Sequence, residues 1–203
     1  MPRRKRTMVS EMNDMDNIQE PEPEQVPVEP VVEGIPKLTV EEVMKKEVIK
    51  LDLGGGDHPA QGYINVDIKY YPQVDLLLDI TKLHEAFPAK TIDGLTCRDT
   101  LQCFSHTEIR RILKNWHTSM KPRSKICIQV YDVNEVARAY AAGEIDFDKF
   151  RIVMFGRQRD QHTMFQNCFT EESLIQLLER SGFVIQETLR PPMRIKVIAI
   201  KVK

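Results

Sequence analysis

A cluster of glycine and acidic residues in the first half of the chain could bind a small polar ligand. Asp52-Leu53-Gly54-Gly55-Gly56 directly follows a β-rich stretch, and glycines let a backbone turn sharply beside a ligand. Asp67 and Asp79 stand at the ends of the next two predicted strands. One such carboxylate can accept both hydroxyls of a ribose, and the next can accept from an exocyclic amine. The order of glycine turn, ribose acid and base-reading acid predicts a nucleoside pocket.

A dinucleotide site is the competing interpretation of the same glycines. Gly54 and Gly56 fit the first two positions of G-x-G-x-x-G, but Pro59 takes the third. A pyrophosphate also needs a helix N-terminus after the turn, and the ten residues between Gly56 and Asp67 leave little room for one. A ligand without a pyrophosphate therefore suits this loop better than NAD.

Short apolar strands alternate with helical patterns in the elements that must position these residues. This alternation predicts an α/β fold, a Rossmann-like, mostly parallel sheet with helices on both faces and a C-terminal antiparallel hairpin. Ligands in such folds bind at the carboxyl ends of the strands. The expected strands are 47–53, 63–67, 74–80, 92–97, 125–131, 183–189 and 195–202.

Helices are expected between these strands. A capping box of Ser105 and Glu108 should begin a helix that Lys121-Pro122 stops. Further helices are predicted over 38–46, over 133–142 and after Thr170. The region 146–169 has weak periodicity and many polar residues, so we expect a loop or lid there.

Several motifs resemble, in order and spacing, those of the class I S-adenosylmethionine-dependent methyltransferases. They are D-L-G-G-G at 52–56, G-Y-I-N-V-D at 62–67, D-I-T-K-L at 79–83, M-K-P at 120–122 and F-T-E-E-S-L…S-G-F at 169–183. The likeness runs from about Val48 to the C-terminus and is greatest to short, single-domain members of the methyltransferase-type-11 kind.

The resemblance implies S-adenosylmethionine as cofactor and gives roles to individual residues. Asp67 would hold the ribose hydroxyls, with Ile68 beside it in the cofactor site. Asp79 and the backbone of Ile80 would read adenine. Two further groups follow from the same resemblance: Asp52, Leu53, Gly54, Gly55 and Gly56 would flank the methionine part, and Arg98 and Asp99 would border the methionine end and face the substrate.

Two positions depart from the family pattern. His58 stands where the usual acid-x-G-x-G-x-G motif has a third glycine, and Leu101-Gln102-Cys103 replaces a Leu-Glu-His that relatives often carry. A potential acid and a potential base are therefore both missing after the fourth strand.

Methyl transfer to a hydroxyl usually needs a base. His162, on the expected lid, is the first candidate and Asp132 the second, although Asp132 could equally cap the helix that follows it. His106 lies inside the predicted capping box, which favours a structural role. The group Arg151, Arg157 and Arg159 could bind an anionic substrate or form a solvated face.

Two functions of different classes follow. The first is an S-adenosylmethionine-dependent methyltransferase acting on a small-molecule or sugar (glycan) acceptor. The alternative is a catalytically inactive methyltransferase-like subunit that binds a partner protein through residues 1–36. A nicotinamide-dependent oxidoreductase is the third interpretation, and Pro59 argues against it.

The N-terminal residues differ in composition from the rest. Residues 1–36 hold six of the twelve prolines, and residues 7–36 hold eight acidic residues with no Lys, Arg or aromatic residue. Such a segment cannot bury enough apolar surface to offset the entropy of ordering. We therefore expect a disordered acidic tail at 1–36, opened by a basic cluster at 3–6, and a folded domain at 37–203.

Overall composition excludes several other classes. The formal charge of −1 argues against a dedicated nucleic-acid binder, and no apolar run approaches the roughly 18 residues of a membrane span. The four cysteines form no C-x-x-C pair and share no ligand spacing with the histidines. We therefore expect reduced thiols, no metal and a cytoplasmic protein.

Overall fold

The computed structural model describes residues 36–202. The predictions for the N-terminal tail and for its basic cluster lie outside these residues.

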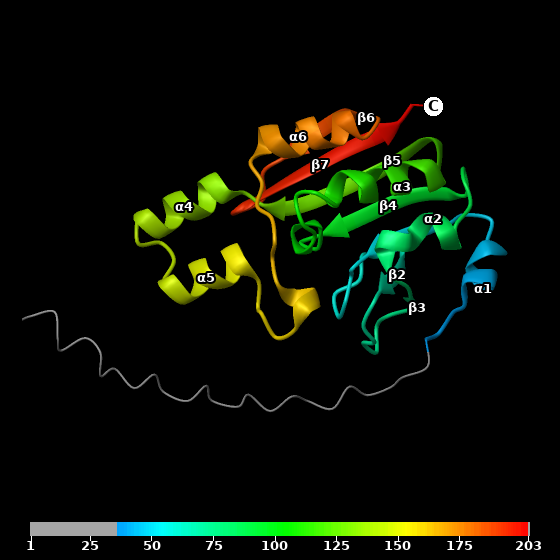
Figure 1. Cartoon of the computed structure of the whole chain (residues 1–203), viewed down its shortest axis with the longest axis horizontal. Coiled ribbons are helices and arrows are strands. Elements are labelled where there is room, and N and C mark those ends of the chain that lie inside the picture. Colours follow the sequence, from blue (N-terminus) through cyan, green and yellow to red (C-terminus); the bar gives the residue numbers. More distant parts are fainter. Residues whose placement is uncertain (1–35, 203) are drawn as a thin grey trace, which may run out of the picture. The chain divides into compact units, whose positions relative to one another are not determined.

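A single seven-stranded sheet organises the fold, as expected (Figure 1). The strand order is β3-β2-β1-β4-β5-β7-β6. The first five strands in this order are parallel, and β7 runs antiparallel to both β5 and β6. The strands are β1 (Lys50–Leu53), β2 (Ile64–Asp67), β3 (Leu76–Leu77), β4 (Ile92–Arg98), β5 (Met120–Tyr131), β6 (Phe183–Leu189) and β7 (Arg194–Lys201).

Within residues 36–202, α1 precedes the first strand, and five further α-helices and three short 3-10 helices lie between later strands. Figure 1 shows α6, α3 and α2 in a row across the sheet, with α4 and α5 beyond the carboxyl ends of β4 and β5. The α-helices are α1 (Val40–Met44), α2 (Leu83–Ala86), α3 (Ile109–Ser119), α4 (Val133–Ala141), α5 (Phe147–Phe155) and α6 (Glu171–Arg180). The 3-10 helices are η1 (Ile80–Lys82), η2 (Leu101–Cys103) and η3 (Gln161–Thr163).

The central strands bury one face of the sheet. From Ile126 to Val130 of β5 and from Ile195 to Ala199 of β7, every second residue is apolar and buried, as the period of two in a strand requires. These side chains join those of α3 and α6 in one apolar core. Trp116 of α3 is fully buried there, and its indole N–H donates to the Ile80 carbonyl at 2.8 Å.

The other face of the sheet is less covered. Lys196, Ile198 and Ile200 of β7 point to it and are only half-buried. Turns and loops, rather than helices, connect β1 to β2 and β2 to β3. The absence of a helix after β1 agrees with the short loop that the sequence predicts.

The region 146–169 is not the continuous loop expected from the sequence. It contains α5, which Asp146 caps by accepting from the Lys149 N–H at 2.7 Å, and then η3. The periodicity is weak because α5 buries only Val153 completely, while Phe147 and Phe155 are more than half exposed. A helix with so narrow a buried stripe has almost no sequence signature.

Two smaller predictions about α3 and β5 were wrong. Ser105 does not cap a backbone N–H; its hydroxyl donates to the Glu108 carboxylate at 2.5 Å, and no side chain caps α3. The helix α3 does end before Lys121-Pro122, but β5 begins at Met120 and not at 125 as predicted, so Pro122 lies inside the strand. Its pairing with β4 shifts register in this stretch, where the proline has no N–H for the ladder.

Candidate functional site

The glycine turn lies at the carboxyl end of β1, between β2 and β4. Gly54 has a φ of 73° and donates its N–H to the Val66 carbonyl at 2.8 Å. A Cβ at Gly54 would lie 2.4 Å from Cγ2 of Thr100. Gly54 is therefore required both for the backbone conformation and for the close approach of the chain after β4.

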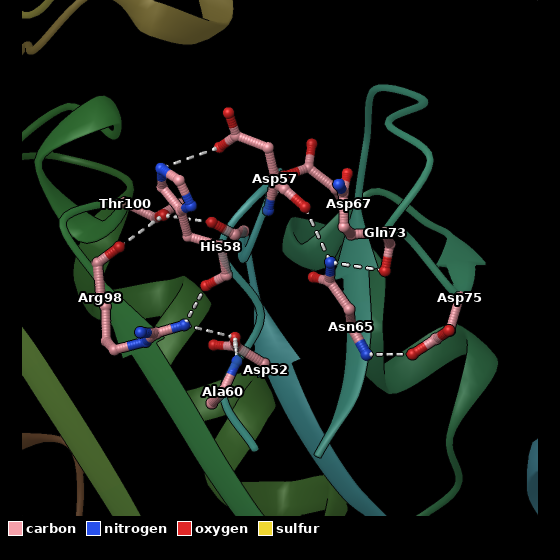
Figure 2. Close-up of polar contacts among 12 residues, drawn as sticks. Asp52, Asp57, His58, Ala60, Asn65, Asp67, Gln73, Asp75, Arg98 and Thr100 are labelled. Atoms are coloured by element: carbon pink, nitrogen blue, oxygen red, sulfur yellow. Dashed lines mark hydrogen bonds and ion pairs between the residues drawn. The ribbon is translucent and has the colours of Figure 1, made fainter. Parts of the chain in front are cut away.

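Asp67 ends β2 directly beside this turn (Figure 2). Its Oδ2 accepts from the Gly56 N–H at 3.1 Å, and its Oδ1 accepts from the Lys69 N–H at 2.9 Å. Burial raises the pKa of Asp67, although these backbone hydrogen bonds oppose the rise. Each carboxylate oxygen keeps a lone pair for a further donor. The turn and the acid are thus joined as the sequence predicts.

A buried ion pair supports the turn from below (Figure 2). Asp52 is fully buried, and its Oδ2 accepts from Arg98 Nη2 at 2.8 Å and from the Ala60 N–H at 2.6 Å. Arg98 Nη2 also donates to the His58 carbonyl at 2.5 Å. Arg98 therefore fixes the β1–β2 loop, and its guanidinium is already engaged by the protein. Leu53, also fully buried, presents only its backbone at the turn.

The β2 side of the turn is fixed by Asn65. Its amide Nδ2 donates to the Gly56 carbonyl at 2.8 Å and to the Gln73 carbonyl at 3.0 Å (Figure 2). A Cβ at Gly55 would lie 2.3 Å from Asn65 Oδ1. The β1–β2 and β2–β3 loops are therefore held by the same amide.

The residues expected to read adenine have structural partners. Asp79 Oδ1 caps η1 by accepting from the N–H and the hydroxyl of Thr81 at 2.9 and 2.7 Å. The Ile80 carbonyl accepts from Trp116. The second carboxylate oxygen of Asp79, Oδ2, remains available as an acceptor. The side chain of Ile68, next to Asp67, is exposed.

Asp99 faces a cation rather than open space. Its carboxylate accepts from Arg194 Nε at 3.0 and 3.1 Å and from Nη2 at 2.9 Å. Arg194 also donates to the Tyr131 hydroxyl at 2.7 Å and stacks over that ring. The cluster locks together the ends of β4, β5 and β7, so Asp99 is not a free carboxylate.

Sequence reasoning missed three residues around Asp67. A Cβ added at Gly56 would lie 3.9 Å from the Tyr71 ring, so this ring lies close to the glycine turn. Lys69 pairs with Asp160 of the loop after α5. Burial, followed by the charges of Asp67 and Asp160, raises the pKa of the Cys103 thiol to about 11. The only signal in the sequence was the Tyr70-Tyr71 pair soon after the acid.

Solved structures share this arrangement of strands. No protein-family model and no curated protein matches the sequence. A 1,6-didemethyltoxoflavin-N1-methyltransferase of Burkholderia thailandensis, solved with S-adenosylhomocysteine, is 18% identical with a TM-score of 0.54 over 76% of this chain and 71% of that chain. An S-adenosylmethionine-dependent methyltransferase of Methanosarcina mazei is 17% identical with a TM-score of 0.55 over 83% and 99%. One from Archaeoglobus fulgidus is 15% identical with a TM-score of 0.54 over 77% and 87%. The chain has the class I S-adenosylmethionine-dependent methyltransferase fold.

The residues of this methyltransferase fold suit the nucleoside half of that cofactor. Asp67 offers two oxygens at the carboxyl end of β2, and Gly56 leaves the space beside it free of a Cβ. Tyr71 supplies a ring at the same place. Arg98 and Asp99, which were expected at the methionine end, are both paired within the protein.

The two catalytic candidates are not brought together. Asp132 is nearly buried and caps α4 by accepting from the Asn134 N–H at 3.0 Å. His162 is exposed on η3, where its backbone N–H donates to Asp160 at 2.8 Å. No hydrogen bond or ion pair joins the two within residues 36–202. His106 is exposed in the turns before α3.

No helix in the described part of the chain combines the length and the apolar character that a membrane crossing requires. Cys97, Cys103, Cys127 and Cys168 are free cysteines.

Proposed function

We propose that this protein binds S-adenosylmethionine and transfers a methyl group to a small-molecule or sugar acceptor. The observation that supports this best is the hydrogen bond from the Gly56 N–H to Asp67, which joins the glycine turn to the acid that follows β2. Parallel strands of this kind bind ligands at their carboxyl ends, and a carboxylate there can accept both ribose hydroxyls.

Each residue has a defined task in this proposal. Asp67 accepts from the ribose, Tyr71 packs against the nucleoside, and Asp79 offers its second oxygen to the adenine amine. Gly54 and Gly56 allow the backbone to approach the methionine portion. The cofactor, when bound, supplies a methyl group on a positively charged sulfur, and the protein has to position the acceptor in line with it.

Proton removal from the acceptor would depend on the loop after α5. His162 is the candidate base in this proposal because it is exposed and lies two residues after Asp160. Asp160 is ion-paired with Lys69, which lies two residues after Asp67. Asp132 is the weaker candidate since its carboxylate caps α4.

A second candidate function, a non-catalytic methyltransferase-like subunit, is favoured by a different observation. Gln102 is buried and Cys103 is a protonated thiol at neutral pH, so the segment after β4 supplies no acid or base. Such a subunit would bind a partner protein through residues 1–36.

An acceptor screen distinguishes the two functions. The purified chain is incubated with S-adenosylmethionine and panels of hydroxyl- and amine-bearing small molecules, and S-adenosylhomocysteine formation is measured. Acceptor-dependent product, reduced in His162→Gln and unchanged in the exposed control His84→Gln, supports the enzyme. Cofactor binding with no turnover on any acceptor, together with a partner lost on deletion of residues 1–36, supports the subunit.

A cytoplasmic location remains part of this proposal. The four free thiols suit a reducing compartment.

A further inference from the structure

A hollow of about 300 Å³ lies between α5 and the loop that follows it. Four of its five lining residues are cations and none is acidic: Lys149, Arg151, Ile152, Arg157 and Arg159. Ile152 adds the one apolar contact. A concave surface with several convergent cations is suited to a small anion.

These cations have few partners within the protein. Only Arg151 reaches a carboxylate, that of Asp148, at 3.7 Å, and both side chains of this pair are largely exposed. Lys149, Arg157 and Arg159 form no ion pair with any residue of 36–202. Four like charges gathered beside one exposed counter-charge repel one another. A bound anion would relieve this repulsion.

The loop that carries Arg157 and Arg159 is held in shape by hydrogen bonds. Gly156 turns the chain with a φ of 78°, and a Cβ there would lie 2.1 Å from the Thr163 carbonyl oxygen. The Thr163 hydroxyl accepts from the Arg159 N–H at 2.9 Å, and its carbonyl accepts from the Gln158 N–H at 3.3 Å. A backbone already fixed loses little entropy when its side chains bind a ligand.

The same loop is tied to the candidate cofactor site. Asp160 directly follows Arg159 and pairs with Lys69, two residues after Asp67. Arg157 lies near enough to Tyr131, at the end of β5, for its charge to oppose the rise in the Tyr131 pKa that burial causes. Because α5 lies beyond the carboxyl ends of β4 and β5 (Figure 1), an anion in the hollow would lie on the side of the sheet where such folds bind their ligands.

Phosphate is the anion that this arrangement fits best. Arginine presents a rigid fork of donors that matches phosphate oxygens, and a dianion matches several cations better than one carboxylate does. The hollow admits a single small group, and the charge of the whole chain is −1, unlike that of a protein that tracks a nucleic-acid backbone. We infer, on the basis of the methyltransferase function proposed above, that the acceptor is a small molecule with a phosphomonoester group. These cations bind that group.

Titration calorimetry on the full chain at constant ionic strength tests this inference. The probes are ribose 5-phosphate, ribose and a single-stranded RNA oligonucleotide. The test variant is Arg157→Gln/Arg159→Gln. Its matched control is Arg110→Gln/Arg111→Gln, which removes the same charge from exposed positions of α3. S-adenosylhomocysteine is titrated into every variant separately.

Ribose 5-phosphate should bind saturably, whereas ribose should not. The test variant should bind ribose 5-phosphate at least about tenfold more weakly, and the control variant should bind it as tightly as the wild type. No saturable binding, or equal weakening in both variants, would overturn the inference. Tighter binding of the oligonucleotide through the same two arginines would overturn it in favour of a nucleic-acid surface. S-adenosylhomocysteine affinity should be equal in all variants, and its absence throughout would contradict the methyltransferase proposal whatever the phosphate result.

Discussion

The ammonium group of Lys69 is ion-paired with the carboxylate of Asp160, 91 positions later in the chain. Lys69 follows β2 and the acid Asp67, whereas Asp160 belongs to the loop after α5. The hydrogen bond to Asp160 raises the pKa of Lys69 against the opposing effect of partial burial. The pair thereby joins the candidate cofactor residues to the candidate acceptor-binding loop.

Removing this pair should loosen the loop without unfolding the protein. In Lys69→Met we expect faster amide hydrogen exchange over residues 156–164. The free energy of unfolding should fall by no more than about 1 kcal/mol, because both partners are about one-third exposed and solvent screens them. Lys37→Met, which breaks the exposed pair with Asp75, is the control. Equal protection of these amides from exchange in the wild type, Lys69→Met and Lys37→Met would show that the Lys69–Asp160 ion pair does not hold the loop.

Two glycines with the same backbone conformation should respond differently to alanine. Gly143 has a φ of 72° and open space around its Cβ position, whereas Gly54 has a φ of 73° and Thr100 at 2.4 Å. Gly143→Ala should cost about 1–2 kcal/mol from the left-handed backbone alone. Gly54→Ala should cost a further ~1–3 kcal/mol for the clash. Urea unfolding compares the two, and equal losses would mean that Thr100 moves freely.

The Arg98–Asp52 pair should contribute more to stability than any exposed pair. Asp52 is fully buried, so Arg98→Met leaves a carboxylate without its counter-charge, at a cost of about 3–5 kcal/mol. Arg190→Met breaks the pair with Glu171, in which the arginine side chain is 63% exposed, and should cost less than about 1 kcal/mol. Urea unfolding measures both, and a similar loss in the two variants would contradict the structural role given to Arg98.

Asp67 should give a pH dependence of opposite sign to that of an ordinary salt-bridged acid. Burial raises its pKa, so the folded chain takes up the proton more readily than the unfolded chain. Between the ordinary pKa and the raised one, stability therefore decreases as the pH rises. Asp67→Asn should flatten this pH dependence. At every pH it should also cost about 1–3 kcal/mol, because its amide NH2 cannot accept from one of the two backbone N–H groups that the carboxylate accepts from. Asp148→Asn, at an exposed position of α5, serves as the control, and an unchanged pH dependence in Asp67→Asn would contradict the raised pKa of Asp67.

Local patterns in the sequence predicted the sheet and its hairpin well. The first five strands in the chain end at or just before an acid or a glycine, and β7 and the part of β5 from Ile126 alternate between buried and half-buried residues. The Gly54 turn and Asp67 could be placed because their positions depend only on strand order. By contrast, α5 could not be predicted, since its large apolar residues remain exposed and give no stripe.

Charge partners could not be predicted at all. Arg98 and Asp99 were both expected at the methionine end, yet one pairs with Asp52 and the other with Arg194, 95 residues away. Asp79 was expected to read adenine and caps η1, whereas Asp132 caps α4, which was one of the two roles predicted for it. Such choices depend on which side chains the fold brings within about 4 Å, information that neither periodicity nor spacing contains.

Calorimetric titration of S-adenosylmethionine and S-adenosylhomocysteine into the full chain, with NAD as a control, tests the central claim most directly. Saturable binding of both and none of NAD is expected. Asp67→Asn should weaken that binding by at least about tenfold, since a carboxylate accepting two hydroxyls loses charge-assisted hydrogen bonds, and Asp148→Asn should leave it unchanged. Absence of binding to the wild-type chain, or equal binding by Asp67→Asn, would contradict the assignment of the glycine turn and Asp67 as a nucleoside site.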